Sequence, residues 1–184
     1  MNTSILFNKS FRFAALASVV AIGAFGASNS FAAKGADSNS SATVIVPIEI
    51  TKKTDLVFGK FAPGAGGDVT VATDGARTTT GPILSVSGAT PTAAKFDVTG
   101  DNDSTYGITW SGVAELTNSG STETMLLTKI SDLTAGGATS GETSSGTLSG
   151  TGAQSIYLGG PWAVGASQAD GNYIGDVTAT VEYN

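Results

Sequence analysis

The last fourteen residues of the chain, Gly171–Asn184, alternate between two kinds of side chain with a period of two. One face of this run carries, in order, Tyr173, Gly175, Val177, Ala179, Val181 and Tyr183. The other face is polar apart from Ile174. Because successive side chains of a β-strand point to opposite faces, the alternation predicts one half-buried strand over 171–183. A terminal strand this regular needs neighbours on both sides, or it presents an edge to which another chain can pair.

The N-terminus has the three parts of a secretory signal peptide. Lys9 and Arg12 form a positive region, residues 13–27 are largely apolar, and Ser30-Phe31-Ala32 is a small-x-small cleavage site. The apolar run is shorter than the ~20 residues that a membrane-spanning helix needs. We therefore expect cleavage after Ala32 and export through the inner membrane to the periplasm, without direct membrane insertion.

The expected mature chain has a flexible polar leader over 33–42 and a single domain over 43–184. Short β-rich runs alternate with clusters of Gly, Asp, Asn and Ser, and apolar residues form no helical stripe of useful length. This pattern predicts an all-β sandwich or barrel. Loss of Lys9 and Arg12 leaves seven basic and fifteen acidic residues, a net charge of −8. That charge argues against nucleic acid or an anionic membrane as the partner.

The chain contains no histidine and no cysteine. Without cysteine an exported domain has no disulfide, so packing and strand pairing must hold it together. Thiolate nucleophiles and thiolate zinc sites are excluded, and the commonest general base is missing. We expect no enzyme activity, no catalytic residues, no metal and no cofactor.

Apolar alternation and turn residues divide the domain into short strands. The predicted strands are 43–51, 55–61, 68–73, 76–80, 82–86, 95–99, 105–112, 114–117, 123–130, 154–158 and 171–183. Asp74-Gly75 is a favourable hairpin turn. The Gly-rich region 135–152 is expected to be a long loop with at most one weak strand near Leu148, and Gly159-Gly160-Pro161 is expected to follow the end of the 154–158 strand.

Three side chains or pairs invite a functional interpretation. Asp101 and Asp103 lie in a sequence that partly matches a calcium loop, but a turn rich in Asp and Asn is favoured. Trp110 shares the parity of Ile108 in an apolar-rich strand, so we expect it in the core. For Trp162, beside Pro161, surface contact and core packing stay equally open.

At both ends the mature domain resembles the chaperone–usher pilin superfamily, in particular its archaic branch and the related spore coat protein U domains. The resemblance rests on the alternating run Thr43–Thr51, the motif Leu56-Val-Phe58-Gly59 and the closing pattern, with Gly171 fourteen residues from the end and Tyr183 penultimate. The same features occur in uncharacterised secreted bacterial domain families. The chain departs from the archaic pattern because it lacks the disulfide cysteines.

The resemblance implies an immunoglobulin-like sandwich that lacks one strand and is completed by a strand donated from the next subunit. The implied donor is 43–51, with the knobs Val44, Val46, Ile48 and Ile50. The implied acceptor strand carries Gly171, Tyr173, Val177, Ala179, Val181 and Tyr183. Burial of four such knobs contributes about 6–12 kcal/mol before ordering costs. The implied partners are copies of the chain or related subunits, a periplasmic chaperone and an outer-membrane usher, and the implied product is a fimbria, pilus or coat at the cell surface.

Pro47 argues against a central donor strand, because proline there loses a ladder hydrogen bond. If 43–51 is instead an edge strand of its own domain, the protein is a self-contained secreted sandwich with a surface-coat or binding role. A small outer-membrane barrel is the remote alternative, since it needs around eight strands of ~9–11 residues and only the last predicted strand is that long.

Overall fold

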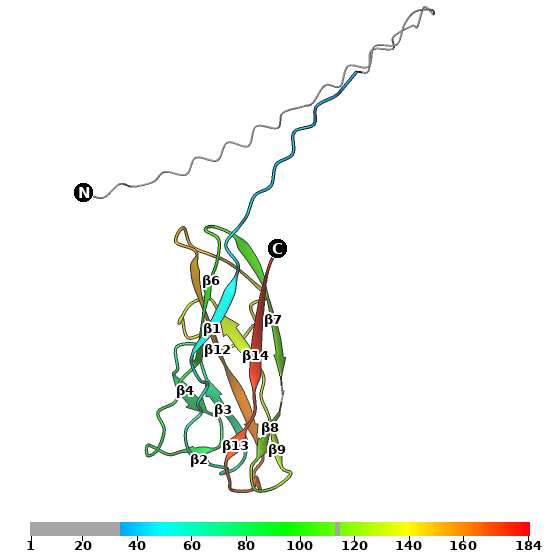
Figure 1. Ribbon diagram of the computed structural model, residues 1–184. Coiled ribbons are helices and arrows are strands. Elements are labelled where there is room, and N and C mark those ends of the chain that lie inside the picture. Colours follow the sequence, from blue (N-terminus) through cyan, green and yellow to red (C-terminus); the bar gives the residue numbers. More distant parts are fainter. Residues whose placement is uncertain (1–33, 113–114) are drawn as a thin grey trace, which may run out of the picture. The chain divides into compact units, whose positions relative to one another are not determined.

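The computed structural model describes residues 34–112 and 115–184 (Figure 1). The predicted signal peptide lies outside the described residues, as does Ala114 at the start of one predicted strand. Residues 34–42 have no regular secondary structure and are exposed. Residues Thr43–Asn184 form one compact unit.

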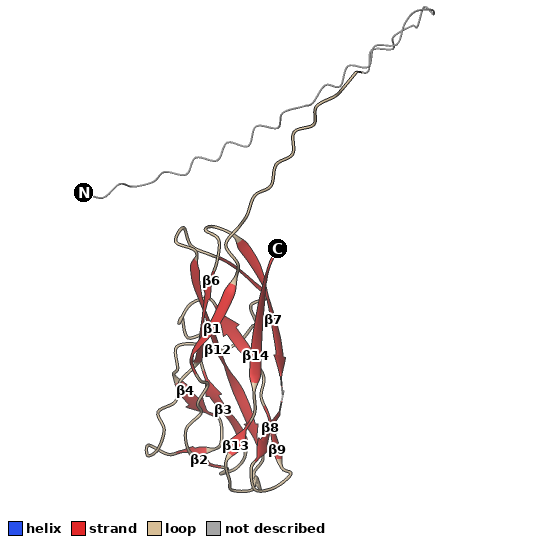
Figure 2. Ribbon diagram, viewed as in Figure 1, coloured by secondary structure: helices blue, strands red, loops and turns tan. Residues whose placement is uncertain are grey.

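Every regular element in the described residues is a β-strand (Figure 2). The strands are β1 (Glu49–Thr54), β2 (Phe61–Ala62), β3 (Gly67–Val71), β4 (Arg77–Thr79), β5 (Ile83–Leu84), β6 (Ala94–Thr99), β7 (Thr105–Gly112), β8 (Glu115–Asn118), β9 (Thr124–Leu126), β10 (Ile130–Asp132), β11 (Ser145–Thr147), β12 (Ala153–Val164), β13 (Tyr173–Ile174) and β14 (Val177–Tyr183).

The strands pair in antiparallel fashion into facing layers. The larger layer has the order β1-β6-β12-β3-β4, with β10 on the other side of β12. The facing strands form two sheets, β11-β7-β14 and β13-β8-β9, while β2 and β5 make a separate pair. The fold is therefore an all-β sandwich, which confirms the predicted class.

Two apolar cores fill the space between the layers. The buried side chains of core one are Ala94, Phe96, Val98, Tyr106, Ile108, Leu148, Ile156, Leu158, Ala179 and Val181. Those of core two are Phe58, Val69, Val71, Leu116, Met125, Leu127, Trp162 and Val164. Core one joins β6, β7, β12 and β14, so the terminal strand is an integral wall of the domain.

The longest strand, β12, runs through Gly159-Gly160-Pro161, where the sequence predicts a strand end. This prediction is wrong because the glycines let β12 change partners without a break. Residues 153–158 pair with β6, and residues 160–164 pair with β3. A Cβ atom at Gly159 would clash with the Val71 carbonyl, and one at Gly160 would clash with the Thr128 carbonyl. The absence of side chains thus permits the close backbone approach on both sides.

Several other predicted elements match the structure, and some do not. The strand 105–112 is β7, the hairpin around Asp74-Gly75 joins β3 to β4, and β11 lies beside Leu148. The predicted strand 55–61 is wrong, since this stretch has only a single bridge from Val57 to Thr92 before β2 begins. The predicted strand 123–130 is two strands, β9 and β10, because β9 pairs with β8 and β10 pairs with β12.

Candidate strand-addition interface

The terminal run forms two strands instead of the single strand 171–183 that its alternation predicts. β13 and β14 are separated by Gly175-Asp176. They part because they pair with different neighbours: β13 with β8, and β14 with β7. Tyr173 packs against core two, and Gly171 precedes β13 and belongs to no strand. The acceptor residues predicted from sequence are therefore divided, and four of the six lie on β14.

One edge of β14 has no strand paired to it in the described part of the chain. β14 pairs with β7 along its whole length, from Val177 opposite Gly112 to Tyr183 opposite Tyr106. Its only sheet, β11-β7-β14, ends there. The backbone groups on the outer side of β14 are thus open to pairing, as expected for an edge strand.

The register shows which residues of β14 present those groups. The Asn184 N–H donates to the Thr105 carbonyl (3.2 Å), and on the other side of β7 the Ile108 N–H donates to the Ser144 carbonyl (2.8 Å). In antiparallel sheets, hydrogen-bonded residue pairs alternate with non-bonded pairs. Even-numbered residues of β14 therefore bond to β7. The residues whose N–H and C=O point to the free edge are Val177, Ala179, Val181 and Tyr183.

These four residues also point their side chains into the sandwich. Ala179 and Val181 are buried in core one, and Val177 and Tyr183 are half-buried against it. A strand added beside β14 would therefore place its own alternate side chains next to core one, because neighbouring strands share their inward face.

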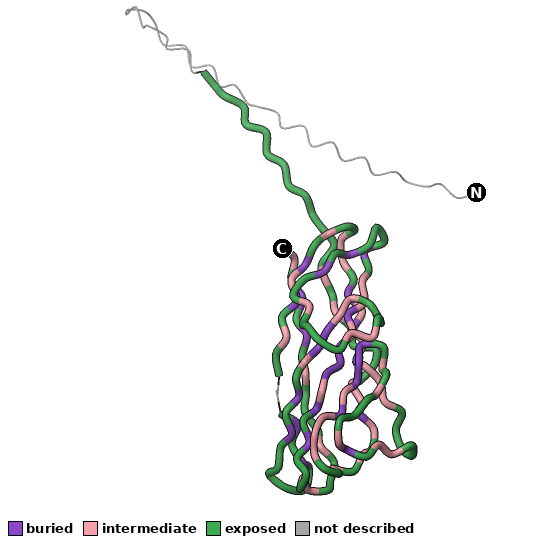
Figure 3. The backbone as a smooth tube through the Cα atoms, turned by 180° about the vertical axis from the view of Figure 1, so that it is seen from behind, coloured by how far each residue is buried: buried purple, intermediate pink, exposed green. Residues whose placement is uncertain are grey.

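Pro47 divides the predicted donor knobs into two pairs. Val44 is 96% exposed and Val46 is 54% exposed, in a stretch with no regular secondary structure. Ile48 and Ile50 are half-buried against core one, and β1 begins at Glu49. The exposed stretch before β1 is visible in Figure 3. We call Thr43–Pro47 the N-terminal segment.

A second free edge belongs to β1. This strand pairs only with β6 among the described strands, from Glu49 opposite Thr99 to Thr54 opposite Lys95. β1 and β14 approach each other without pairing, and they lie side by side in Figure 1. The sandwich therefore has two unpaired edges where core one meets the N-terminal strand.

Sequence reasoning missed a side-chain contact between the two ends of the domain. The Tyr183 hydroxyl donates to the Val46 carbonyl (2.8 Å) and accepts from the Asp101 N–H (2.5 Å). Alternation places Tyr183 on the inward face of β14, but it carries no information on what its hydroxyl meets.

The two tryptophans both serve the core. Trp110 packs edge-on against Phe96, with ring centroids 6.0 Å apart, which confirms the core prediction. Trp162 is only 6% exposed and packs against Phe58 and Phe61 in core two. Surface contact, one of its two open interpretations, is therefore wrong, because β12 continues past Pro161 and carries Trp162 inward.

The loop that contains Asp101 and Asp103 is a tight turn. Asp103 has a positive φ of 58°, and the Ser104 N–H donates to the Asp101 carbonyl (3.4 Å). Within residues 34–112 and 115–184, no group of three or more acidic, histidine or cysteine side chains is placed to hold a metal ion.

A polar cluster ties β6 to β12 on the outer face of the larger layer. The Ser155 hydroxyl donates to the Asp97 carboxylate (2.8 Å), and the Lys95 ammonium lies 3.2 Å from the same oxygen. The hydrogen bond from Ser155 is the main cause that lowers the pKa of Asp97, and Lys95 adds to it. The cluster favours the charged form of Asp97. It also links β12 to β6, the strand with which β1 pairs.

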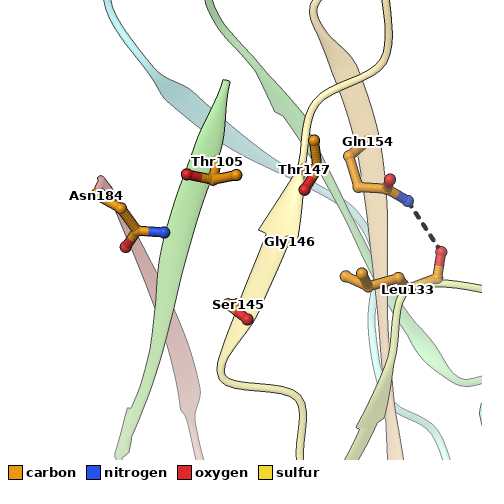
Figure 4. Close-up of a pocket in the computed structure, with 7 residues that line it drawn as sticks. All are labelled: Thr105, Leu133, Ser145, Gly146, Thr147, Gln154 and Asn184. Atoms are coloured by element: carbon orange, nitrogen blue, oxygen red, sulfur yellow. Dashed lines mark hydrogen bonds between the residues drawn. The ribbon is translucent and has the colours of Figure 1, made fainter. Parts of the chain in front are cut away.

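A hollow lies next to β11, and residues on both sides of that strand line it (Figure 4). It is lined by Thr105, Leu133, Ser145, Gly146, Thr147, Gln154 and Asn184. Gln154 uses its side-chain amide to hold the Leu133 carbonyl (3.1 Å). None of the side chains that line this hollow is acidic or basic.

The sequence matches the family described as "Domain of unknown function (DUF4402)" over residues 48–183. The chain therefore belongs to this family, whose matched region begins just after the N-terminal segment. Searches of curated proteins and of solved structures gave no match. The described residues contain no helix with the length and apolar character needed to cross a membrane.

Proposed function

We propose that this protein is a structural subunit of a surface fibre or coat, assembled by strand donation between copies of the chain or related subunits. The N-terminal segment of one subunit adds to the free edge of β14 in the next. A periplasmic chaperone covers that edge before assembly, and an outer-membrane usher delivers the subunits to the cell surface.

The exposure of the N-terminal segment is the observation that carries the proposal. Val44, Ile45 and Val46 are consecutive aliphatic residues that are each more than half exposed. Among the described strands, β6 does not extend beside them, because it ends at Thr99, opposite Glu49, and they pair with no other strand. Burial of Val44 and Val46 against another subunit's core one would contribute about 3–6 kcal/mol, to which main-chain pairing adds.

The proposed contact is head-to-tail, since the segment precedes the first strand and the acceptor is the last strand. Such a contact joins two different surfaces, so it can be repeated from subunit to subunit and, unless the rotation closes a ring, builds an open chain. Only Ile48 separates the segment from β1, so consecutive subunits would be joined without a long flexible spacer. A linear, semi-rigid fibre follows from this connection.

A self-contained secreted sandwich is the second candidate, and one observation favours it. Glu49–Thr54, part of which lies within the donor run implied by resemblance, pairs with β6 of its own domain. Ile48 and Ile50 thereby pack against core one in the same chain. In this alternative the domain is complete alone and serves as a monomeric coat or binding protein.

Electrophoresis of exported protein under denaturing conditions tests the proposal, with unheated beside heated samples. We expect an unheated ladder that collapses to one band on heating, because donated strands dissociate slowly. Val44→Asp should abolish the ladder, since it places a charge among the buried knobs. Ser41→Asp, which adds the same charge at an exposed leader position, should keep it. A single band in unheated wild type, or a normal ladder in Val44→Asp, would refute the proposal.

A further inference from the structure

Tyr183 joins three parts of the domain that are distant in sequence. Its hydroxyl donates to the Val46 carbonyl and accepts from the Asp101 N–H, while its ring is half-buried against core one. The hydroxyl therefore uses its one donor and one of its two acceptor lone pairs. This contact is the one hydrogen bond found between β14 and the N-terminal segment in the described residues.

The backbone around Gly100 is shaped to admit this tyrosine. A Cβ atom at position 100 would clash with the Tyr183 hydroxyl and would also lie 3.0 Å from the Leu148 side chain. Glycine leaves the space that the hydroxyl occupies. The turn after β6 thus contacts the Tyr183 side chain at the end of β14.

The position of this contact matters because it is the one hydrogen bond found in the described residues between the N-terminal segment and the rest of the domain. Val44 and Val46 make no strand pairing, and the segment enters β1 directly through Ile48. A carbonyl that accepts from Tyr183 fixes the last part of the segment beside the C-terminal end of β14. Loss of this hydrogen bond should make the segment more mobile.

We infer that Tyr183 is a latch that ties the N-terminal segment to its own subunit and must open before the segment is donated. The latch rests on the proposed function for its role in assembly, but its existence does not depend on assembly. It makes the segment less available to proteases and to acceptor subunits while closed.

Tyr183→Phe tests the latch because it removes the hydroxyl and keeps the ring. Thermolysin, which cuts before aliphatic residues that are not followed by proline, is applied to the exported monomer, and mass spectrometry follows cleavage between Val44 and Ile45. We expect cleavage to become about two- to tenfold faster, the range that one hydrogen bond of ordinary net strength allows. Tyr173→Phe is the matched control, since that hydroxyl donates to the Ala169 carbonyl (2.9 Å) and should leave the rate unchanged.

Gly100→Ala gives the same test without altering the tyrosine, because the added methyl group displaces the Tyr183 hydroxyl. Its control is Gly107→Ala, where a Cβ atom would have only an ordinary contact with the Asn184 side chain at 3.4 Å. Faster cleavage in Gly100→Ala, with unchanged cleavage in Gly107→Ala, supports the latch. Unchanged cleavage in both Tyr183→Phe and Gly100→Ala overturns it.

The two proposals fail in different ways. Faster cleavage in Tyr183→Phe, from a protein that never forms heat-sensitive ladders, supports the latch and contradicts the fibre. Ladders that form at the wild-type rate in Tyr183→Phe, with unchanged cleavage, support the fibre and overturn the latch. Faster cleavage together with faster ladder formation supports both.

Discussion

Val44 and Val46 have the same chemistry and the same parity as Ile48 and Ile50, yet the two pairs have opposite environments. The first pair is mostly exposed, and the second pair packs against core one. The boundary lies at Pro47. The comparison teaches that alternation marks a stretch as fit for a sheet without specifying which chain supplies its neighbour.

The length of β6 explains the difference between the two pairs. β6 supplies partners for residues from Glu49 onward, and it ends at Thr99. The chain then turns through Gly100–Ser104, so no strand continues upstream beside the N-terminal segment. Within the described residues, β6 therefore provides no partner for the upstream pair.

The largest expected effect on stability comes from a substitution in the downstream pair, Ile48 and Ile50. Ile50→Asp should lower the free energy of unfolding by about 2–3 kcal/mol, because it removes apolar burial and places a charge against core one. Val44→Asp should change it by less than about 0.5 kcal/mol, as for other exposed positions. Urea unfolding of the monomer measures both. Equal losses in the two variants would contradict the assignment of the segment to the outside of its own domain.

A smaller effect on stability should come from removing a side-chain hydrogen bond between β12 and β6, the strand that pairs with β1. Ser155→Ala removes the hydrogen bond that lowers the pKa of Asp97. A lowered folded-state pKa contributes stability that is present above the unfolded-state pKa and is lost as pH falls through the folded-state value. We therefore expect Ser155→Ala to cost up to about 1 kcal/mol at neutral pH, and less in acid.

The measurement is urea unfolding of wild type and Ser155→Ala at pH 7 and below the ordinary Asp value of 3.8. Ser145→Ala on β11 is the control, since that exposed hydroxyl has no charged partner in the described structure. A cost that stays constant down to low pH would show that the hydroxyl acts through packing and not through Asp97.

Alternation predicts β7 with its observed bounds, but the predicted strand 43–51 is wrong in its first part, since β1 begins only at Glu49. The path of β12 through Gly159-Gly160-Pro161 was not predictable, because local turn preference was outweighed by pairing with β3 and β6. The break between β13 and β14 could not be predicted either, because it also results from pairing with other strands. It depends on two separate partner strands, and alternation alone continues across it.

The candidate site was predictable in outline, since parity places Val177, Ala179 and Val181 on one face of the terminal strand. The division of the donor knobs at Pro47 was not predictable, because it depends on where β6 ends. The contact of Tyr183 with Val46 was also out of reach, since it joins residues far apart in sequence through a loop conformation that only the folded chain defines.

The central claim is that the N-terminal segment pairs with β14 of another molecule, and cysteine cross-linking tests it most directly. The chain has no cysteine, so any disulfide must form between the introduced cysteines, either within one molecule or between two molecules. Val44→Cys is combined in turn with Val177→Cys, Ala179→Cys or Val181→Cys, and with Thr78→Cys on edge strand β4 as the control. We predict disulfide-linked oligomers from at least one β14 pair and none from the β4 pair. A monomer with an internal disulfide, or no cross-link from any β14 pair in assembled material, would contradict strand donation between subunits.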